Sequence, residues 1–250
     1  MVLFVPAGSG FPYYARPRLG DRPPVTVADI RKVRARQREL VIPESFEWIA
    51  QAAPDIAAPA AQSGLVVHPH PLLVLDQRVA PVSVPDGVAV RLITPDDPDL
   101  HRVWAVPSVA FGHPGTAAGV AGDLERDKIA ADHDAGTIAM LRERLRSRHS
   151  VLAAAFDTEG PLAAGSCQTE GDVAEITGVG VLPARRRAGL GAAVTAALAA
   201  DALRRGVGTV FLSAADEAVA RIYMRIGFRR IGTAMIAEPA ELGCADELRD

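Results

Sequence analysis

The feature that most constrains the fold is the stretch EITGVGVLPARRRAGLG at residues 175–191. Its apolar run at 176–182 has the β-branched content and the length of a buried strand, and Pro183 ends it. Gly189 and Gly191 let the backbone approach a ligand closely, and the first N–H groups of the Ala-rich helix that follows have no acceptor inside the helix. The stretch therefore predicts a strand, a Gly-rich corner and a helix N-terminus that suits a phosphate.

The corner does not carry either of the two common nucleotide-binding motifs. No Lys-Ser/Thr follows the glycines, which excludes a nucleoside-triphosphate P-loop, and the full Gly-x-Gly-x-x-Gly of a dinucleotide fold is absent. What remains is Arg186-x-x-Gly189-x-Gly191. A short glycine motif also occurs in simple strand-to-helix turns, so this motif alone does not distinguish a phosphate-binding corner from such a turn.

Composition narrows the class of protein. A chain of 250 residues with 49% hydrophobic positions can bury one large core or two small ones. A net charge of -3 provides no basic footprint for nucleic acid and no attraction to an anionic membrane. Cys167 and Cys244 have no metal-ligand spacing and indicate no disulfide framework, and the N-terminus has no basic leader or long apolar run. We therefore expect a cytoplasmic protein without a nucleic-acid or membrane partner and without a metal.

The first 80 residues predict a short run of alternating helices and strands. Thr26-x-x-Asp29 resembles a capping box that opens a helix ending before Pro43. A strand follows at 46–49, then a helix that Pro54 opens and that runs to about Gln62, and then two strands at 65–67 and 72–75 joined by HPHP.

The same order of elements recurs at the end of the chain. A long helix, a strand at 210–213, a helix through Met224 and a final strand after Gly227-Phe228 repeat the pattern. We therefore predict that residues 26–76 are a degenerate partial copy of residues 188–237 that lacks the phosphate-binding glycines and binds no cofactor. The predicted domains are an N-terminal segment at 1–80, a Pro-rich linker at 81–86, a main domain at 87–240 and a C-terminal tail at 241–250.

The main domain begins with a strand at 88–93 and a helix that Asp97 caps and Pro107 kinks or ends. A loose Gly-rich stretch follows, and then a helix at 137–148. Strands at 150–156 and 162–168, joined by the turn sequence DTEG, form a meander with the strand at 175–182. The Gly-rich stretch is expected to be mobile and irregular.

A second motif, DEAVARIYMRIGF at 216–228, resembles Asn-x-x-Ala-x-x-Leu-Tyr-x-x-x-Gly-Phe of the GNAT N-acetyltransferase superfamily, and the corner resembles that family's Arg/Gln-x-x-Gly-x-Gly/Ala signature. The resemblance covers roughly residues 87–237. It implies an α/β (α+β) GNAT fold, with a mixed and mostly antiparallel central sheet flanked by helices, and a smaller incomplete GNAT-like domain at the N-terminus.

The resemblance also implies a co-substrate, acetyl-CoA. Its pantetheine arm would pair with the strand edge, and its pyrophosphate would lie at the corner, where Arg185, Arg186 and Arg187 add positive charge unless they are only a solvated surface. Asp216 stands where the family usually has Asn, so a hydrogen bond donated there is in doubt. The implied cofactor-binding residues are Val179, Gly180, Val181, Arg186, Arg187, Ala188, Gly189, Leu190, Gly191, Ala192 and Asp216.

Two residues are the predicted catalytic groups. Tyr223 has a position similar to that of the family's tyrosine that protonates the leaving thiolate, although it also fits a core aromatic residue. Glu175 lies eleven residues before Arg186, a spacing similar to that of the family's general base, although a glutamate at a strand end is often merely exposed. The acceptor region offers His113, His133 and Glu143 as substitutes for this base.

The predicted activity is transfer of an acetyl group from acetyl-CoA to a primary amine, by direct transfer in a ternary complex. Two alternatives stay open: a non-catalytic acyl-CoA-binding or scaffold protein, and an acyltransferase for a longer acyl-CoA, for which Gly178 and Gly180 could leave room. The sequence does not specify whether the amine belongs to a small molecule or a peptide, and it leaves a homodimer open.

Overall fold

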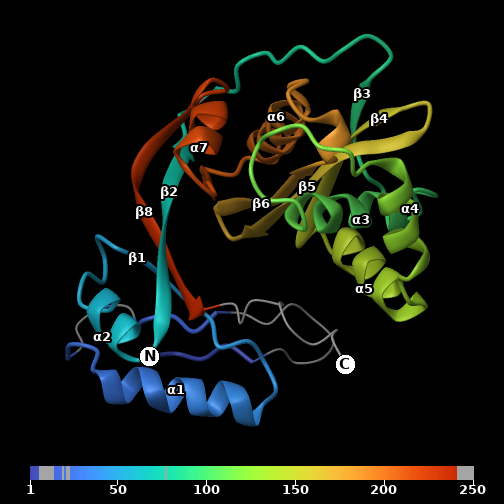
Figure 1. The fold of residues 1–250 in the computed structure, drawn as a ribbon. Coiled ribbons are helices and arrows are strands. Elements are labelled where there is room, and N and C mark those ends of the chain that lie inside the picture. The colour runs from blue at the N-terminus through green and yellow to red at the C-terminus, as the bar shows by residue number, and fades with distance from the viewer. Residues whose placement is uncertain (6–13, 19, 21–22, 77, 241–250) are drawn as a thin grey trace. The chain divides into compact units, whose positions relative to one another are not determined.

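The computed structural model describes residues 1–5, 14–18, 20, 23–76 and 78–240. The chain packs as two compact units, one from residues 1–71 together with the chain from Gly232 on, and one from Leu72 to Ile231. Figure 1 shows the elements in chain order. They are α1 (Val27–Glu39), β1 (Phe46–Ile49), α2 (Ala57–Gln62), β2 (Leu65–Leu75), β3 (Ala89–Leu92), α3 (Leu100–Phe111), α4 (Asp123–Ala131), α5 (Ala135–Arg146), β4 (Ser150–Asp157), β5 (Gly160–Glu170), β6 (Val173–Val181), the 3-10 turn η1 (Pro183–Arg185), α6 (Leu190–Arg204), β7 (Thr209–Ser213), α7 (Glu217–Met224) and β8 (Phe228–Pro239).

The strands form an eight-stranded sheet in the order β1-β8-β2-β7-β6-β5-β4-β3. β6 and β7 run parallel, whereas β1 with β8, β2 with β7, and the successive pairs from β3 to β6 run antiparallel. This mixed, mostly antiparallel open sheet with flanking helices confirms the predicted fold class.

In the larger unit, helices cover both faces of the sheet. Alternate residues of β4 show this, because Ala153 and Ala155 pack in one core cluster with α6, whereas Leu152 and Ala154 pack in another with α3 and α5. We call these the α6 face and the α3 face. Tyr223, from α7, belongs to the cluster on the α6 face.

The smaller unit has its own core. Ile30, Phe46 and Ile56 are fully buried there, and β1 pairs with the end of β8. Thr26 caps α1, and its hydroxyl accepts from the Asp29 amide while the Asp29 carboxylate accepts from the Thr26 amide, so the predicted capping box is confirmed.

Four predicted elements are corrected by the structure. HPHP does not separate two strands, because β2 runs without a break from Leu65 to Leu75. Pro107 does not end its helix, since α3 continues to Phe111. Asp97 does not cap α3; its carboxylate binds Arg91. The helix α4 occupies a stretch for which no helix was predicted.

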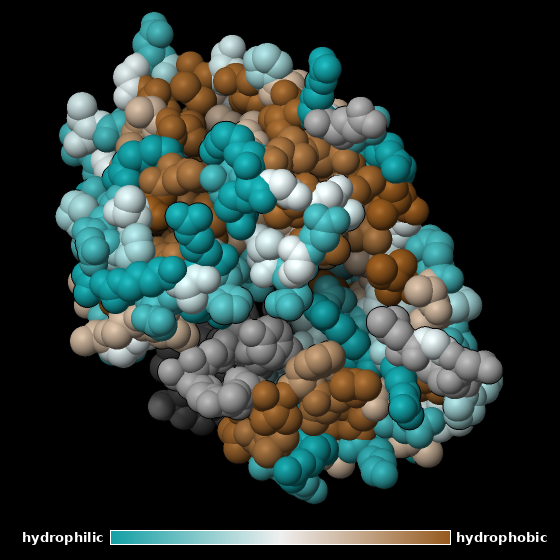
Figure 2. Space-filling model, turned by 180° about the vertical axis from the view of Figure 1, so that it is seen from behind, coloured by the Kyte–Doolittle hydropathy of each residue, from teal (hydrophilic) through white to brown (hydrophobic). Residues whose placement is uncertain are grey.

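The face in Figure 2 carries apolar patches set among hydrophilic residues. Among the described helices, none is both long enough and apolar enough to cross a bilayer.

Candidate functional site

A bulge in β6 shapes the strand that precedes the corner. Ser166 pairs with Thr177 and Ala164 pairs with Gly180, so two residues of β6 stand opposite Gly165 of β5. One of the two, Gly178, has a φ of 63°, which a glycine adopts without strain. The extra residue reverses which face of the sheet each later side chain of β6 points to.

The bulge brings Gly180 onto the α3 face. A Cβ built on Gly180 would lie 2.8 Å from Cβ of Ala110 and 2.9 Å from Cα of Pro107. The space beside Gly180 is therefore filled by α3, so this glycine does not provide the room for a longer acyl chain that the sequence suggested. Val179 and Val181 pack on the α6 face instead.

β6 and β7 separate partway along their length. They pair from Val173 with Thr209 to Glu175 with Phe211, and the described residues show no further pair between them. On its other side β7 pairs with β2. The backbone of β6 beyond Glu175 thus has an edge on its β7 side, and the predicted residues Val179, Gly180 and Val181 lie along it.

The corner joins this edge to the start of α6. Gly189 is the residue before the helix and has a φ of 75°, and Arg187 is also left-handed, with a φ of 69°. A Cβ on Gly191 would lie 3.3 Å from Cγ2 of Val181, so the helix start packs closely on the strand. The amides of Leu190, Gly191 and Ala192 belong to the first turn, where intrahelical acceptors are lacking, and Ala188 and Gly189 precede them. These residues fit a pyrophosphate group.

The three arginines of the corner have different partners. Arg185 forms ion pairs with Asp123 at 3.4 Å and with Asp157 at 3.6 Å. The guanidinium of Arg186 donates to main-chain carbonyls. Arg187 is exposed, and no carboxylate of the described residues pairs with it. Of the three arginines, only Arg185 pairs with carboxylates of the described residues, and Arg187 is the one whose guanidinium has no hydrogen bond or ion pair with a protein group there.

Tyr223 is buried, with 8% of its surface exposed, and its ring lies 6.3 Å from that of Phe228. Burial raises the pKa of its phenol to about 12, and a hydrogen bond with Thr195 opposes this only partly. The Thr195 hydroxyl donates at 2.8 Å to the carbonyl of Gly191. The phenol is therefore neutral at physiological pH and is linked through one side chain to the first turn of α6.

Glu175 lies at the point where β6 and β7 separate. Its neighbours Ala174 and Ile176 are buried on the α6 face, so the alternation of the strand points Glu175 to the α3 face. Its side chain is half-buried. Tyr223 and Glu175 thus belong to opposite faces of the sheet.

Asp216 caps the helix that carries Tyr223. One oxygen of its carboxylate accepts from the Val219 amide at 2.8 Å, and its own backbone is extended. A capping Asp performs this task as well as Asn does, so the departure from the family's residue leaves α7 properly started.

The three other candidate bases differ in their surroundings. Nδ1 of His113 is 2.9 Å from the carbonyl of Val109, and Glu143 is exposed on α5. Burial lowers the pKa of His133. Cys167 is fully buried, and burial raises the pKa of its thiol to about 11, which makes it a poor nucleophile. Among the described residues no cluster of His, Cys, Asp and Glu is arranged to hold a metal ion.

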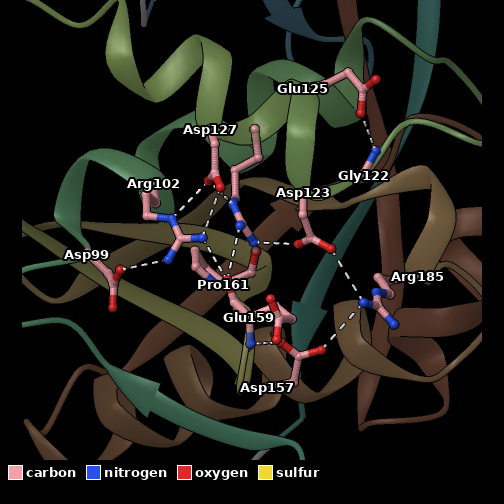
Figure 3. A network of polar contacts seen from close by, with 11 residues as sticks. Asp99, Arg102, Gly122, Asp123, Glu125, Asp127, Asp157, Glu159, Pro161 and Arg185 are labelled. Atoms are coloured by element: carbon pink, nitrogen blue, oxygen red, sulfur yellow. Dashed lines mark hydrogen bonds and ion pairs between the residues drawn. The ribbon is translucent and has the colours of Figure 1, made fainter.

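A buried arginine, which sequence reasoning missed, organises the helices beside the corner. Arg126 of α4 is fully buried and donates to Asp123 and Asp127 and to the carbonyls of Glu159 and Pro161 in the β4–β5 turn. Figure 3 shows Asp127 also bound by Arg102, and Asp123 reaching Arg185. The only sequence signal for Arg126 is an aspartate three residues before it and another directly after it, and exposed ion pairs on helices share the three-residue spacing.

Comparison with known protein families gives a match, and the matched segment contains Glu175, the corner and Tyr223. Residues 119–228 match the acetyltransferase (GNAT) family. No curated protein matches the chain.

Solved structures share the fold at low identity. A GCN5-related N-acetyltransferase from Kribbella flavida is 22% identical, with a TM-score of 0.57, and the match covers 86% of this chain and 74% of that one. A GCN5-related N-acetyltransferase from Sphaerobacter thermophilus is 20% identical, with a TM-score of 0.55 and coverage of 81% and 62%. A tandem GNAT protein from the clavulanic acid biosynthesis pathway is 18% identical, with a TM-score of 0.52 and coverage of 86% and 70%.

Proposed function

Because residues 119–228 match the acetyltransferase (GNAT) family, we propose that the chain transfers an acetyl group from acetyl-CoA to a primary amine by direct transfer in a ternary complex. The observation that carries the proposal is the separation of β6 from β7 beyond Glu175, beside the open start of α6. An edge strand and a helix N-terminus there match an extended polar arm that ends in a pyrophosphate.

In this proposal the chain holds acetyl-CoA mainly through its backbone. Val179, Gly180 and Val181 present main-chain groups to the pantetheine arm, and the amides at 188–192 surround the pyrophosphate, while the exposed guanidinium of Arg187 adds charge. Acetyl-CoA itself supplies a thioester, whose carbonyl an amide of β6 polarises.

Tyr223 is the proposed proton donor to the leaving thiolate. Its phenol stays protonated because burial raises its pKa, and its link to Thr195 fixes the ring over the first turn of α6. Glu175, from the other face, is the proposed base that receives the proton of the amine, directly or through water.

The direct mechanism is favoured over a covalent acetyl-enzyme. Of the two cysteines, Cys167 lies within the described residues. It is buried and the pKa of its thiol is raised, so it is a poor nucleophile for forming an acetyl-enzyme. Cys244 lies outside the described residues.

A non-catalytic acyl-CoA-binding protein is the second candidate. It is favoured by the engagement of Arg185 and Arg186 with protein groups, since this leaves the phosphate corner with fewer free cations than the sequence suggested. Calorimetry with acetyl-CoA, together with a thiol-release assay over an amine panel, distinguishes this candidate from the enzyme. A non-catalytic protein would bind acetyl-CoA and release no thiol with any amine.

The test of the proposed function is a thiol-release assay with acetyl-CoA over small amines, amino acids, aminoglycosides and peptide N-termini. We expect turnover with at least one class, and we expect Tyr223→Phe to lower kcat by about 10²-fold or more while coenzyme A still binds. Phe keeps the ring beside Phe228, so its effect isolates the hydroxyl. Full turnover in this variant would remove Tyr223 from the mechanism.

The partners and the location of the protein remain proposals as well. The acceptor is a small-molecule or peptide amine, and we propose a cytoplasmic protein that binds neither nucleic acid nor membrane and that is able to form a homodimer.

A further inference from the structure

The loop between α3 and α4 was expected to be mobile, yet the structure fixes it to the corner. We call residues 112–122 the docked loop. The amide of Gly119 donates at 3.1 Å to the carbonyl of Pro183, and the amide of Ala184 donates at 2.9 Å to the carbonyl of Ala121. These reciprocal bonds join the loop to η1 as two short strands would be joined.

Two of the glycines of the docked loop, Gly119 and Gly122, are placed for close approach to η1. A Cβ on Gly119 would lie 3.1 Å from Cβ of Pro183, and a Cβ on Gly122 would lie 3.3 Å from Cβ of Ala184. At the far end of the loop, the Glu125 carboxylate accepts from the Gly122 amide at 2.7 Å and fixes the start of α4.

Arg186 holds the other end of the docked loop. Its guanidinium donates to the carbonyl of Ala110 at 2.9 Å, of His113 at 2.6 Å and of Ala117 at 3.1 Å. Ala110 lies in the last turn of α3, where the helix dipole favours a cation, and its carbonyl also accepts from the His113 amide at 3.2 Å. The guanidinium reaches these carbonyls from two separate nitrogens, whereas a lysine ammonium offers its three N–H groups from a single nitrogen.

We infer that Arg186 is a positioning residue for the acceptor side of the site, which fixes the docked loop against the corner instead of neutralising phosphate charge. This inference rests on the proposed function, in which the loops between α3 and α5 border the acceptor. The two neighbouring arginines then have different roles, because Arg186 orders the docked loop and Arg187 faces the phosphates. The corner that binds the coenzyme then also sets the place of the loop.

The experiment compares Arg186→Met, Arg186→Lys and Arg187→Met in the full chain, with coenzyme A as the ligand. Arg187→Met is the matched control, since it removes the same charge one residue away. Two readouts are taken: hydrogen exchange of the amides at 112–122 and of Ala184 without ligand, and the Kd of coenzyme A by calorimetry.

We expect both Arg186 variants to speed exchange in the docked loop about tenfold, because neither keeps the fork, and we expect Arg187→Met to leave it unchanged. We expect Arg187→Met to raise the Kd about fivefold and Arg186→Met to change it less than about twofold. Unchanged exchange in Arg186→Met would overturn the inference. So would a loss of coenzyme A affinity in Arg186→Met together with wild-type affinity in Arg186→Lys.

The hydrogen-exchange result can be interpreted whether or not the proposed function is correct. If the wild-type protein binds no coenzyme A, the proposed function fails, and the exchange readout still decides whether Arg186 fixes the loop. Where an acceptor is found, the inference also expects Arg186→Lys to raise the KM of the acceptor more than that of acetyl-CoA.

Discussion

Burial at Tyr223 affects both the proposed chemistry and the stability of the protein. The phenol's pKa is raised from 10.0 to about 12 in the folded state by burial. A group whose folded pKa is raised contributes stability that is complete below its unfolded pKa and is lost as pH rises through the folded value. The window for Tyr223 is therefore from about pH 10 to about pH 12.

We predict that the wild-type protein loses about 2 kcal/mol of unfolding free energy between pH 9 and pH 11.5 that Tyr223→Phe does not lose, because phenylalanine has no proton to release. Urea unfolding of both proteins at the two pH values measures the difference. Parallel losses in the two proteins would show that the phenol is not buried in the way described.

At the scale of the element, β6 depends on its glycines for contact with α3. We predict that Gly180→Ala lowers the unfolding free energy by about 1–3 kcal/mol, because its methyl group would overlap Ala110 and Pro107, and Pro107 contributes backbone atoms there. Thermal and urea unfolding measure this loss.

Gly112→Ala is the matched control for that substitution. Gly112 has a right-handed backbone, and a Cβ there would lie 3.4 Å from its nearest neighbour, the Ser108 carbonyl oxygen. We expect a change within about 0.5 kcal/mol for this variant. Equal losses at both positions would contradict the account of β6 packing.

The sequence predicted those helices and strands whose apolar pattern and turn residues lie within the element itself. The strand at Phe46–Ile49 was predicted with the observed bounds, and the meander of β4, β5 and β6 was predicted through its turn sequence. The helix α4 was missed because its sequence, DLERDKIAA, is mostly polar, and its buried arginine takes the place of an apolar stripe. β2 was divided in two because prolines usually interrupt strands.

The positions of the candidate site residues were predictable only in part. The corner at 183–191 was recognisable because its glycines and proline act on their own backbone. The partners of Arg185 and Arg186 lie 28 to 76 residues away in sequence, counted from Asp157 to Arg185 and from Ala110 to Arg186, so no local pattern could assign them. The separation of β6 from β7 is likewise a property of the sheet and has no counterpart in one strand's sequence.

At the scale of the whole molecule, the order α1-β1-α2-β2 repeats the order α6-β7-α7-β8. This agrees with the predicted partial copy in element type, and the copy itself stays a prediction. Superposition of residues 26–76 on residues 188–237 tests it, and a failure to match element for element would contradict it.

The Arg126 network links α3, α4 and the β4–β5 connection to Arg185 of the corner, so replacing Arg126 should destabilise the larger unit as a whole. Hydrogen bonds from Arg126 and then Arg102 hold the pKa of Asp127 far below its usual value. A carboxyl with a lowered folded pKa contributes stability above its unfolded pKa, near 4, that is lost as pH falls below it. We predict that Arg126→Met costs about 3 kcal/mol at pH 6, since it leaves two carboxylates and two carbonyls without their buried partner.

The same substitution should flatten the acid dependence, because Asp127 then has less interaction to lose between pH 5 and pH 2. Urea unfolding across this range measures both effects. Arg146→Met is the control, since Arg146 and Asp96 form an exposed pair that should contribute less than about 1 kcal/mol. If Arg126→Met and Arg146→Met gave the same loss at pH 6 and the same acid slope, Arg126 would not be the residue that joins α4 to the sheet.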